Sequence, residues 1–433
     1  MKNTTWLAPL AVLLLLAGCT KQGNDSSTEA LPAEVDGTDP PASSPEALPA
    51  EIERVDLLTF ARGALFAGQT GSHAGNALRA IDGDPRILAI TTDGGGPVEF
   101  VYKMPALTTF DRFAIPNVIE RPGNATFVKS VVVSGSSVSP DSGYQVLATF
   151  ALETHGPDEE VTEIVPEAPV PVRWVKVNFD GGILIEEGHE GRTNIEFTEL
   201  VGNGTQDVRP LSTAYSGVWA FKLTEALHLQ GSPLELHQDG TTITGCLNET
   251  VINGTVNGPI ARATGVDTMR GNTSAFIFVA DEDSSIQAVV SVNNSLFSPY
   301  TAVVDSDVTT TSCSDAPPEP SACGAIVYVN FDVDSAVIRP ESEQVLSDLY
   351  DRLIADGAAT VSIEGHTSTE GSAPYNQDLS ERRAQAVVDA LVARGFDAAG
   401  IAAVGKGETE PLLSPDDNES ARSLNRRVEI HCQ

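Results

Sequence analysis

The spacing of hydrophobic residues changes near residue 325, and this change constrains the fold more than any other feature of the chain. Between residues 60 and 313, short runs rich in Val, Ile, Thr and aromatic residues alternate with Gly, Pro, Asn and Asp turns, which is typical of strands. Beyond residue 325 the spacing becomes helical, as in Val345, Leu346, Leu349, Leu353 and Ile354. The sequence therefore predicts a multidomain protein with all-β domains followed by one α/β domain.

Two all-β domains are expected. Residues 60–205 contain no segment of helical period, and we predict a β-sandwich there. Residues 213–313 contain three pairs that favour hairpin turns, namely Asp239-Gly240, Asn253-Gly254 and Asn257-Gly258. We predict a β-meander that curls into a small barrel or sandwich.

Residues 324–433 predict the order β-α-β-α-β-β. The expected strands are 325–331, 360–364, 401–404 and 427–431, with helices that begin near Pro340 and Asn376 and end at Gly357 and Gly395. This order argues for an α/β sandwich whose helices lie on one face of the sheet.

Three separated blocks of residues mark this last domain. They are Gly365-His366-Thr367-Ser368-Thr369-Glu370-Gly371, then Asn376 with Leu379-Ser380-Glu381-Arg382-Arg383-Ala384, and finally Asn425-Arg426-Arg427. In this order they resemble the OmpA-like peptidoglycan-binding domain, and the resemblance covers residues 324–433. One position departs from the family pattern, because Ser368 stands where the family has aspartate.

The resemblance implies a ligand and a site. The family's ligand is the diaminopimelate side chain of the peptidoglycan stem peptide, which carries one ammonium and one carboxylate. Arg383 matches the arginine that takes the carboxylate, whereas the family's aspartate takes the ammonium. Asp334, Asn376 and Arg426 match positions that line the pocket.

The helical geometry agrees with a binding role for Arg383. It falls at the edge of the apolar stripe of its helix, Arg382 points away, and Asn376 lies seven residues earlier on nearly the same side. A guanidinium held there can bind a carboxylate through two parallel bonds. The alternative is an arginine that extends from the core to solvent.

Ser368 carries no charge, so the anion must come from elsewhere. Glu370, two residues on in the same loop, is expected to restore it. The alternative is that Glu370 is an ordinary surface residue and that the domain keeps the fold without the ligand.

The N-terminus predicts a lipoprotein. Lys2 precedes an apolar run from Trp6 to Leu16, which is too short to span a membrane and closes on Leu16-Ala17-Gly18-Cys19. Residues 1–18 are therefore a predicted signal peptide, and Cys19 is the predicted site of lipidation with palmitate and other acyl chains. An ordinary secretory signal with a chance cysteine is the alternative. Thr20 replaces the aspartate that favours inner-membrane retention in bacterial lipoproteins, which implies the outer membrane.

Two segments are predicted to be linkers. Residues 19–59 are rich in Ser, Pro, Glu and Ala and should form a disordered tether. Residues 314–323 form a second, short linker before the α/β domain.

The remaining four cysteines allow at most two disulfides in an oxidising envelope, with three possible pairings. Cys323 precedes the first strand of the last domain and Cys432 ends its last strand. We therefore favour Cys323–Cys432, with Cys246–Cys313 in the preceding domain.

A weaker resemblance concerns residues 60–205. The segment from Asn76 to Asp84, followed by strands, is similar to the discoidin or galactose-binding-like sandwich. That family often holds calcium, so Asp82 and Asp84 could hold a calcium ion with loop carbonyls. Carboxylates that cap a tight turn are the alternative. Trp174 shares its side of a strand with Lys176 and Asn178 and could serve a sugar site, although a large aromatic in a strand is more often core.

The net charge and the motifs limit the range of plausible functions. The net charge of -34 excludes nucleic acid and anionic lipid headgroups as plausible partners. No nucleophile elbow, metal motif or paired carboxylates stand out, so we expect a non-enzyme without a cofactor. We predict an outer-membrane lipoprotein that faces the periplasm and links the membrane to peptidoglycan. The alternative is a carbohydrate-binding adhesin that uses the α/β domain only as an anchor.

Overall fold

We describe a computed structural model of the chain over residues 55–85, 88–91, 97–118, 126–152, 160–179, 183–185, 194–224, 230–282, 285–304 and 321–433. The predicted signal peptide, Cys19, residues 19–54 of the tether, Cys313 and residues 314–320 of the second linker lie outside these residues. The prediction of a disordered tether was wrong for its last residues, because Leu57 and Leu58 are buried in the core and Asp56 forms a β-bridge with Asn203. Residues Ile52–Gln433 belong to one compact unit.

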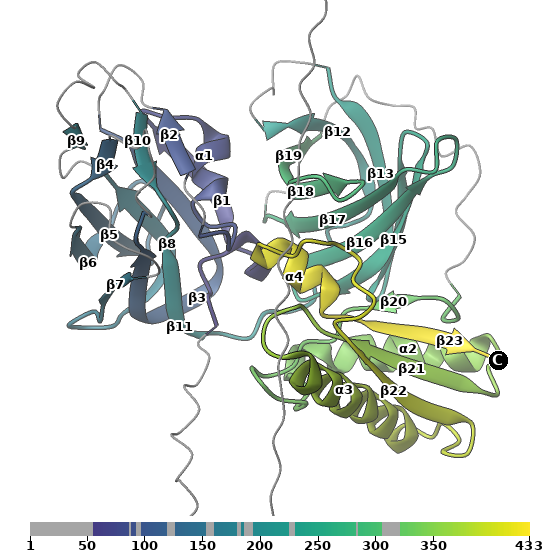
Figure 1. Cartoon of the computed structure of the whole chain (residues 1–433). Coiled ribbons are helices and arrows are strands. Elements are labelled where there is room, and N and C mark those ends of the chain that lie inside the picture. Colours follow the sequence, from purple (N-terminus) through teal and green to yellow (C-terminus); the bar gives the residue numbers. More distant parts are fainter. Residues whose placement is uncertain are drawn as a thin grey trace, which may run out of the picture. The chain divides into compact units, whose positions relative to one another are not determined.

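The N-terminal part of this unit contains two β-sheets (Figure 1). The first has seven strands in the order β1-β3-β8-β5-β6, with β7 and β11 also paired to β3. Its strands are β1 (Leu65–Thr70), β3 (Glu99–Pro116), β5 (Ser130–Ser136), β6 (Gln145–Ala151), β7 (Val161–Ile164), β8 (Pro171–Asn178) and β11 (Val201–Gln206). The second sheet has the order β2-β10-β4-β9, with β2 (Leu88–Thr91), β4 (Thr126–Val128), β9 (Ile183–Ile185) and β10 (Asn194–Phe197).

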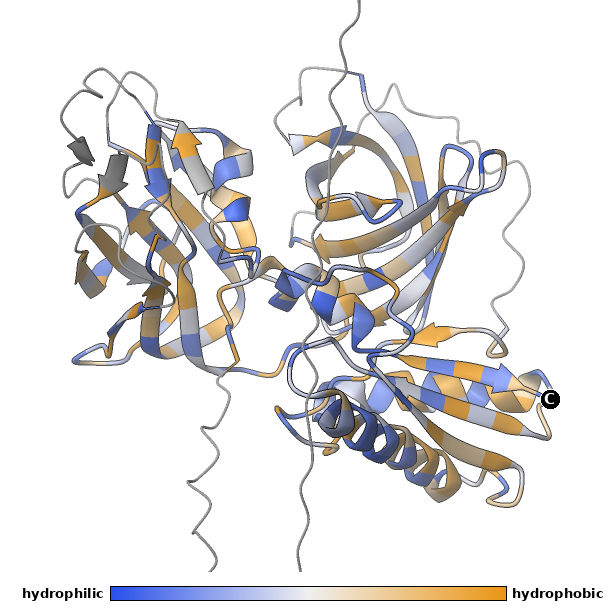
Figure 2. Ribbon diagram, in the orientation of Figure 1, coloured by the Kyte–Doolittle hydropathy of each residue, from blue (hydrophilic) through white to orange (hydrophobic). Residues whose placement is uncertain are grey.

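Aromatic side chains join the two sheets. The ring of Phe179, just after β8, lies 5.3 Å from that of Phe100 on β3 and 5.0 Å from that of Phe197 on β10. All three rings are buried. Figure 2 shows hydrophobic and polar residues alternating along the strands, as expected when one face of each sheet packs against the core.

This part also contains two short helical elements that the sequence analysis did not predict. A 3-10 turn, η1 (Phe60–Arg62), precedes β1, and helix α1 (Ala74–Arg79) follows it. Six residues make fewer than two helical turns, so α1 leaves no recognisable period in the sequence. Tertiary contacts hold it, because Ala77 is buried and its carbonyl accepts a hydrogen bond of 2.7 Å from the Tyr102 hydroxyl.

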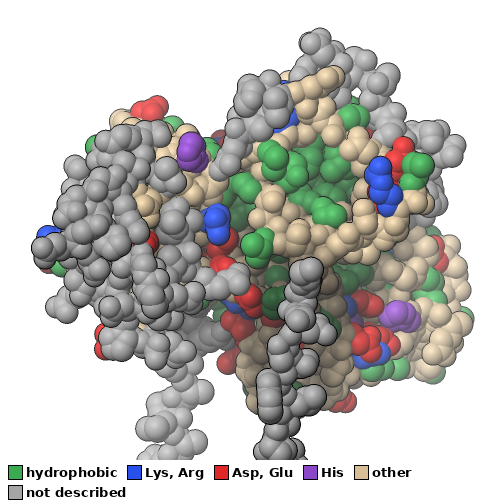
Figure 3. All heavy atoms as spheres, turned by 45° about the horizontal axis from the view of Figure 1, so that its top comes forward, with side chains coloured by type: hydrophobic (Ala, Val, Ile, Leu, Met, Phe, Trp, Pro, Cys, Tyr) green, Lys and Arg blue, Asp and Glu red, His purple; other side chains and the backbone are tan. Residues whose placement is uncertain are grey.

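Strands β12–β19 form a closed barrel, which is one of the two predicted alternatives. Consecutive strands pair antiparallel, and β19 pairs with β12. Buried aromatic residues of this part include Tyr215, Trp219, Phe221, Phe276 and Phe278. Figure 3 shows hydrophobic side chains gathered at one end of the barrel. The strands are β12 (Gly217–Leu223), β13 (Ser232–Asp239), β14 (Thr242–Leu247), β15 (Thr250–Asn257), β16 (Ile260–Asp267), β17 (Thr273–Ala280), β18 (Ile286–Val292) and β19 (Ser298–Val303).

Two of the three predicted hairpin turns are present. Gly240 and Gly258 adopt positive φ angles of 54° and 61° between consecutive strands. The Asn253-Gly254 prediction was wrong, because both residues lie within β15. A Cβ atom on Gly254 would lie 2.2 Å from the Arg262 carbonyl oxygen on β16, so glycine there allows close approach of the strands.

The C-terminal part has a four-stranded sheet in the order β20-β23-β21-β22, with α2 and α3 packed against it (Figure 1). The strands are β20 (Ile326–Val327), β21 (Val361–His366), β22 (Ile401–Gly407) and β23 (Val428–Cys432). The helical elements are η3 (Pro340–Ser342), α2 (Glu343–Ala355), α3 (Ala373–Ala393) and α4 (Glu419–Asn425). Among the described helices, none is long and apolar enough to cross a membrane.

Two details of the predicted β-α-β-α-β-β order were wrong. Helix α4 lies between β22 and β23, and its buried residues include Ser420 and Ser423, so it lacks a clean apolar stripe. Strand β20 is shorter than the predicted 325–331. The carbonyl of Tyr328, just beyond it, accepts a hydrogen bond of 3.0 Å from Asn257 of the barrel instead of a partner strand.

The disulfide between Cys323 and Cys432 is present as predicted, with the two Cα atoms 5.3 Å apart. Cys246 is also disulfide-bonded. Its predicted partner, Cys313, lies outside the described residues, so the Cys246–Cys313 pairing stays a prediction.

A buried apolar cluster joins the sandwich, the barrel and the C-terminal part. Polar contacts cross the same junction, because the Gln287 side chain accepts from the Phe66 N–H at 3.0 Å and donates to the Phe66 carbonyl at 2.6 Å. We refer to the apolar cluster as the junction core: Phe60, Ala61, Leu65, Leu78, Ile260, Ala275, Ile277, Val279, Val289, Tyr328, Leu413, Ala421 and Leu424.

Candidate functional site

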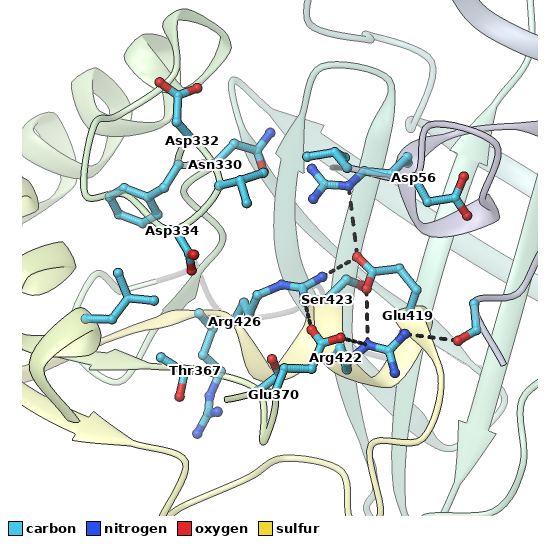
Figure 4. A pocket seen from close by; sticks show the side chains of 18 of the residues that line it. Asp56, Asn330, Asp332, Asp334, Thr367, Glu370, Glu419, Arg422, Ser423 and Arg426 are labelled. Carbon is cyan, nitrogen blue, oxygen red and sulfur yellow. Dashed lines mark hydrogen bonds and ion pairs between the residues drawn. The ribbon is translucent and has the colours of Figure 1, made fainter. Parts of the chain in front are cut away.

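A cavity of about 400 Å³ lies beside the residues of the C-terminal motif. Its lining comes from the segment between β20 and α2, the loop between β21 and α3, α3 itself and α4. Residues of the sandwich and Arg262 of the barrel complete it (Figure 4). All of the residues predicted to bind the ligand line this cavity: Asp334, Ser368, Glu370, Asn376, Arg383 and Arg426.

Arg383 sits on α3, whose buried stripe includes Leu379, Ala384 and Val387. Its Nε donates to the Ser335 carbonyl at 3.0 Å, and its guanidinium lies 5.1 Å from the centre of the Phe331 ring. Burial, and next the Arg426 charge, lower the pKa of Arg383 to about 10, so it stays protonated at neutral pH. In the described part of the chain, no carboxylate lies within ion-pair distance of Arg383.

The neighbouring arginine behaves differently, as the helical geometry predicts. Arg382 is exposed, and its Nε lies 2.7 Å from an Asp378 carboxylate oxygen one turn earlier on α3. Arg383 is therefore the arginine of this pair that faces the cavity.

Asn376 ties α3 to the motif loop. It is buried, and its side-chain amide donates to the Ser368 carbonyl at 3.2 Å and to Glu408 at 2.5 Å. Ser368 itself is buried at the cavity wall. Ser368, which stands where the resembling family has aspartate, is therefore held in place by the hydrogen bond from Asn376.

The loop after Ser368 is fixed by two residues that were not predicted as site residues. Asp416 accepts hydrogen bonds from the Thr369 N–H at 2.9 Å, from the Thr369 hydroxyl and from the Asn425 amide at 3.1 Å. Burial alone would raise the pKa of Asp416, yet the hydrogen bonds from Thr369 hold this pKa below its ordinary value. Asn425 belongs to a motif block, which could have suggested this role, but Asp416 left no sequence signal.

Glu370 is already paired within the protein. One of its carboxylate oxygens lies 3.4 Å from Arg422 Nε and the other lies 3.4 Å from Arg426 Nη1. Glu419 contacts the same two arginines, at 3.3 Å from Arg422 Nε and in a shorter contact with Arg426. Figure 4 shows the two carboxylates alternating with the two arginines along α4. No sequence pattern singled out Glu419 or Arg422, because no helix was predicted there.

Asp334 has fewer charged partners within the described residues than Glu370 has. It lies between β20 and α2 with a positive φ of 51°, is exposed, and accepts a hydrogen bond of 2.7 Å from the Tyr375 hydroxyl. In the described residues no cation lies within ion-pair distance of it. In Figure 4 its carboxylate faces the side of the pocket that carries Arg426, whereas the neighbouring Asp332 carboxylate points away. Tyr375, a further lining residue, was not predicted.

The sandwich contributes two carboxyl groups to the cavity. Asp56 accepts hydrogen bonds from the Leu58 and Gly202 N–H groups at 3.0 and 2.8 Å, and burial raises its pKa to about 7. Glu199 accepts from the Gly83 N–H at 2.5 Å, and burial, next the Asp56 charge, raises its pKa well above the ordinary value. Both groups therefore carry less than a full negative charge near neutral pH.

The predicted calcium loop is occupied by protein donors. The Asp84 N–H donates to an Asp82 carboxylate oxygen at 3.0 Å, as in a capped turn. The Asp82 carbonyl accepts from the Glu419 N–H at 3.2 Å, and the Gly83 carbonyl accepts from Arg422 Nη2 at 2.9 Å. Among the described residues, no group of three or more His, Cys, Asp and Glu side chains could hold a metal ion. Two of the loop carbonyls thus accept hydrogen bonds from the protein itself, and calcium stays a prediction.

Trp174 lies on β8 and is half-buried, together with Lys176 and Asn178 on the same side of the strand. The ammonium of Lys176 lies 4.5 Å from the centre of the Tyr144 ring. A sugar site at Trp174 stays a prediction.

Residues 330–426 match the family model described as OmpA family. Outer membrane protein A of Klebsiella pneumoniae is 44% identical over 114 residues, which cover 24% of this chain and 33% of that protein. The chain therefore spans between about a third and a half of the length of the curated relatives that it matches.

Solved structures give two further likenesses. The peptidoglycan-associated lipoprotein from Burkholderia pseudomallei is 30% identical, and the match covers 24% of this chain and 88% of that one, with a TM-score of 0.23. The family 32 carbohydrate-binding module from C. perfringens NanJ, solved in complex with galactose, is 15% identical over 34% of this chain and 96% of that one, with a TM-score of 0.25.

Proposed function

Because the C-terminal part of this chain is an OmpA-family domain over residues 330–426, we propose that the chain binds diaminopimelate-type peptidoglycan non-covalently through the cavity beside Arg383. One observation carries the proposal: Arg383 is a half-buried, protonated guanidinium in a cavity, with no carboxylate within ion-pair distance in the described residues. Such a cation is ready to receive the carboxylate of a ligand through two parallel hydrogen bonds.

The ammonium of the ligand needs a carboxylate that Ser368 does not supply. Glu370 was expected in this role, but Arg422 and Arg426 already neutralise its charge. Asp334 lines the same cavity and is engaged by the neutral Tyr375 hydroxyl. We therefore favour Asp334 over Glu370 as the partner of the ammonium.

The anchor completes the proposed function. Outer membrane protein A, a relative of the C-terminal domain, is by its name an outer-membrane protein. With the Leu16-Ala17-Gly18-Cys19 sequence, this supports an outer-membrane lipoprotein that faces the periplasm, is lipidated at Cys19 and links the membrane to the cell wall. Replacement of Cys19 by Ser should release the chain from the membrane fraction, and continued retention would contradict the anchor.

Sedimentation with purified sacculi tests the binding function. The chain without its signal peptide should co-sediment with sacculi, and Arg383→Ala should abolish this because the carboxylate loses its only proposed cation. Arg382→Ala is the matched control, since it removes an exposed arginine of the same helix that pairs with Asp378. Equal loss in both variants, or unchanged sedimentation of Arg383→Ala, would contradict the proposed site.

A further inference from the structure

Arg262 on β16 is a buried cation whose charge the protein does not balance. The residue is 5% exposed, and within the described residues it forms no ion pair. Its Nη2 donates to the Ala61 carbonyl at 2.8 Å, but its Nε has no hydrogen-bond partner. Its guanidinium lies 5.9 Å from the centre of the Tyr328 ring, which offsets part of the cost of burial.

A buried, unpaired charge is among the most costly features a fold can contain. Burial, and next the Arg62 charge, lower the pKa of Arg262 to about 10. This value still lies well above neutral pH, so the side chain remains charged and the cost persists. A ligand with a negative charge that pairs with Arg262 best explains why a buried, unpaired arginine stands at this position.

Two further arginines line the end of the cavity that holds Arg262, and they lie close enough for their charges to lower its pKa. Arg62 ends η1, and its Nε lies 3.9 Å from a Glu419 carboxylate oxygen. Arg426, which directly follows α4, pairs with Glu419 and also with Glu370. Burial lowers the pKa of Arg62, and the Arg426 charge contributes to the same shift.

The charges at this end do not cancel. Four arginines line it, namely Arg62, Arg262, Arg422 and Arg426, and the ionised carboxylates among them are Glu370 and Glu419. Asp56 and Glu199 lie in the same lining, but both hold their protons more tightly than ordinary carboxyl groups. This end of the cavity therefore has a surplus of positive charge.

We propose that Arg262, with the surplus positive charge of Arg62 and Arg426 beside it, forms a second anion subsite, which accepts a further carboxylate of the same acidic peptide that Arg383 holds. The inference rests on the proposed function and specifies which form of the stem peptide is bound. A stem peptide of the diaminopimelate type carries more than one carboxylate, and an amide at the second position would leave the arginines unpaired. The chain should therefore prefer the acidic form of the peptide to the amidated form.

The subsite exists only in the complete compact unit. Arg62 comes from the sandwich, Arg262 from the barrel and Arg426 from the C-terminal part. The junction core packs these three parts together, with Ala61, Ile260 and Leu424 all buried in it. The sandwich and the barrel thus contribute to recognition by the OmpA-family domain.

Calorimetric titration of the chain without its signal peptide tests this. The probes are free diaminopimelate, the tripeptide alanyl-γ-glutamyl-diaminopimelate, and the same tripeptide with its glutamyl carboxylate amidated. The wild type should bind the acidic tripeptide about tenfold more tightly than the amidated one, as one charge-assisted contact allows. Arg262→Met should remove this preference and leave the affinity for free diaminopimelate unchanged.

Two control variants distinguish the subsite from a purely structural role of Arg262. Arg209→Met removes a partly buried arginine that donates to the Arg62 carbonyl at 3.1 Å but does not line the cavity, and it should keep the preference. Arg383→Ala should abolish binding of all three probes. Arg262→Lys keeps the charge and should retain part of the preference if Arg262→Met fails to fold.

The outcomes are distinct. If Arg262→Met binds every probe as the wild type does, Arg262 is a structural support and the subsite is overturned while the proposed function stands. If Arg262→Met loses the preference and still binds free diaminopimelate with the wild-type affinity, the subsite is supported. If the wild type binds no probe, the proposed function fails and the subsite with it.

Discussion

Ser368 stands where the resembling family has aspartate, and two neighbouring carboxylates differ in their ability to supply that charge. Glu370 lies between Arg422 and Arg426, whereas Asp334 is hydrogen-bonded to the neutral Tyr375 hydroxyl. A carboxylate that already has two cationic partners gains less from a third than one that has none. The single substitution thus moves the expected anion from the motif loop to the segment between β20 and α2.

We therefore expect Asp334→Asn to weaken binding of free diaminopimelate about tenfold, because a charge-assisted hydrogen bond to the ammonium becomes a neutral one. Glu370→Gln should change the affinity less. Calorimetric titration of both variants gives the comparison. A larger loss for Glu370→Gln would restore the role that the sequence first suggested for that residue.

The carboxyl group of Asp56 predicts a pH-dependent stability. Its pKa is about 7 in the folded chain, above its ordinary value of 3.8. Between these values the folded state holds a proton that the unfolded state releases, so the contribution of Asp56 to stability is complete below pH 3.8 and is lost as the pH rises to 7. Asp56→Asn keeps an oxygen that can accept the Leu58 and Gly202 N–H bonds and does not titrate.

The free energy of unfolding of Asp56→Asn, relative to the wild type, should thus increase between about pH 4 and pH 8 by at least ~1 kcal/mol. Urea denaturation at several pH values measures this difference. His366 titrates in both proteins and does not depend on Asp56, so its contribution cancels. The Asp56 charge raises the pKa of Glu199, so the measured difference reports these two carboxyl groups together. A difference that does not change with pH would contradict the raised pKa.

At the scale of elements, helix α4 connects the cavity with the sandwich and with the junction core. It places Arg422 and the adjoining Arg426 at the cavity, contacts the sandwich through Glu419 and places Leu424 in the junction core. The helix is only seven residues long, so its N-terminal cap matters. The Asn418 side chain accepts a hydrogen bond of 2.8 Å from the Ala421 N–H.

Asn418→Ala removes this cap and should lower the free energy of unfolding by about 1 kcal/mol. Asn418→Asp is the matched control, because aspartate caps helices equally well. Since α4 positions Arg426 of the second anion subsite, the alanine variant should also weaken binding of the acidic tripeptide. Urea denaturation measures the first effect and calorimetry the second, and an alanine variant as stable as the aspartate variant would contradict the assigned cap.

At the scale of the whole molecule, the junction core makes the three parts depend on one another. Tyr328, Leu413 and Leu424 of the C-terminal part are buried in that core together with residues of the sandwich and the barrel. A protein that consists of residues 321–433 alone would expose these side chains. Burial of each large apolar side chain contributes roughly 1.5–3 kcal/mol.

We expect the isolated 321–433 protein, with its Cys323–Cys432 disulfide intact, to unfold at a lower urea concentration than the same part within the complete chain. A tryptophan reporter is needed, because residues 321–433 contain no tryptophan, and Tyr375→Trp, an exposed position, can supply it in both proteins. Equal midpoints would show that the junction core contributes nothing to the stability of this part.

The sequence determined those features that depend on short stretches of chain. Helical and strand periods predicted α2, α3 and the four strands of the C-terminal sheet, and helical spacing predicted that Arg383 and Asn376 lie on one side of a helix. The disulfide of Cys323 and Cys432 followed from their positions at the two ends of one domain. These features are local because period, spacing and turn residues are properties of neighbouring residues.

The tertiary structure decided what depends on contacts between distant residues. Helices α1 and α4 are short, so packing and not period stabilises them. The sequence suggested Glu370 as the anion that binds the ligand. In the structure Glu370 is paired with Arg422 and Arg426, and the helix that positions these arginines was not predicted. The unbalanced charge of Arg262 depends on burial against Ala61, 201 positions away in the chain, and no local pattern can show which charges a fold leaves without a partner.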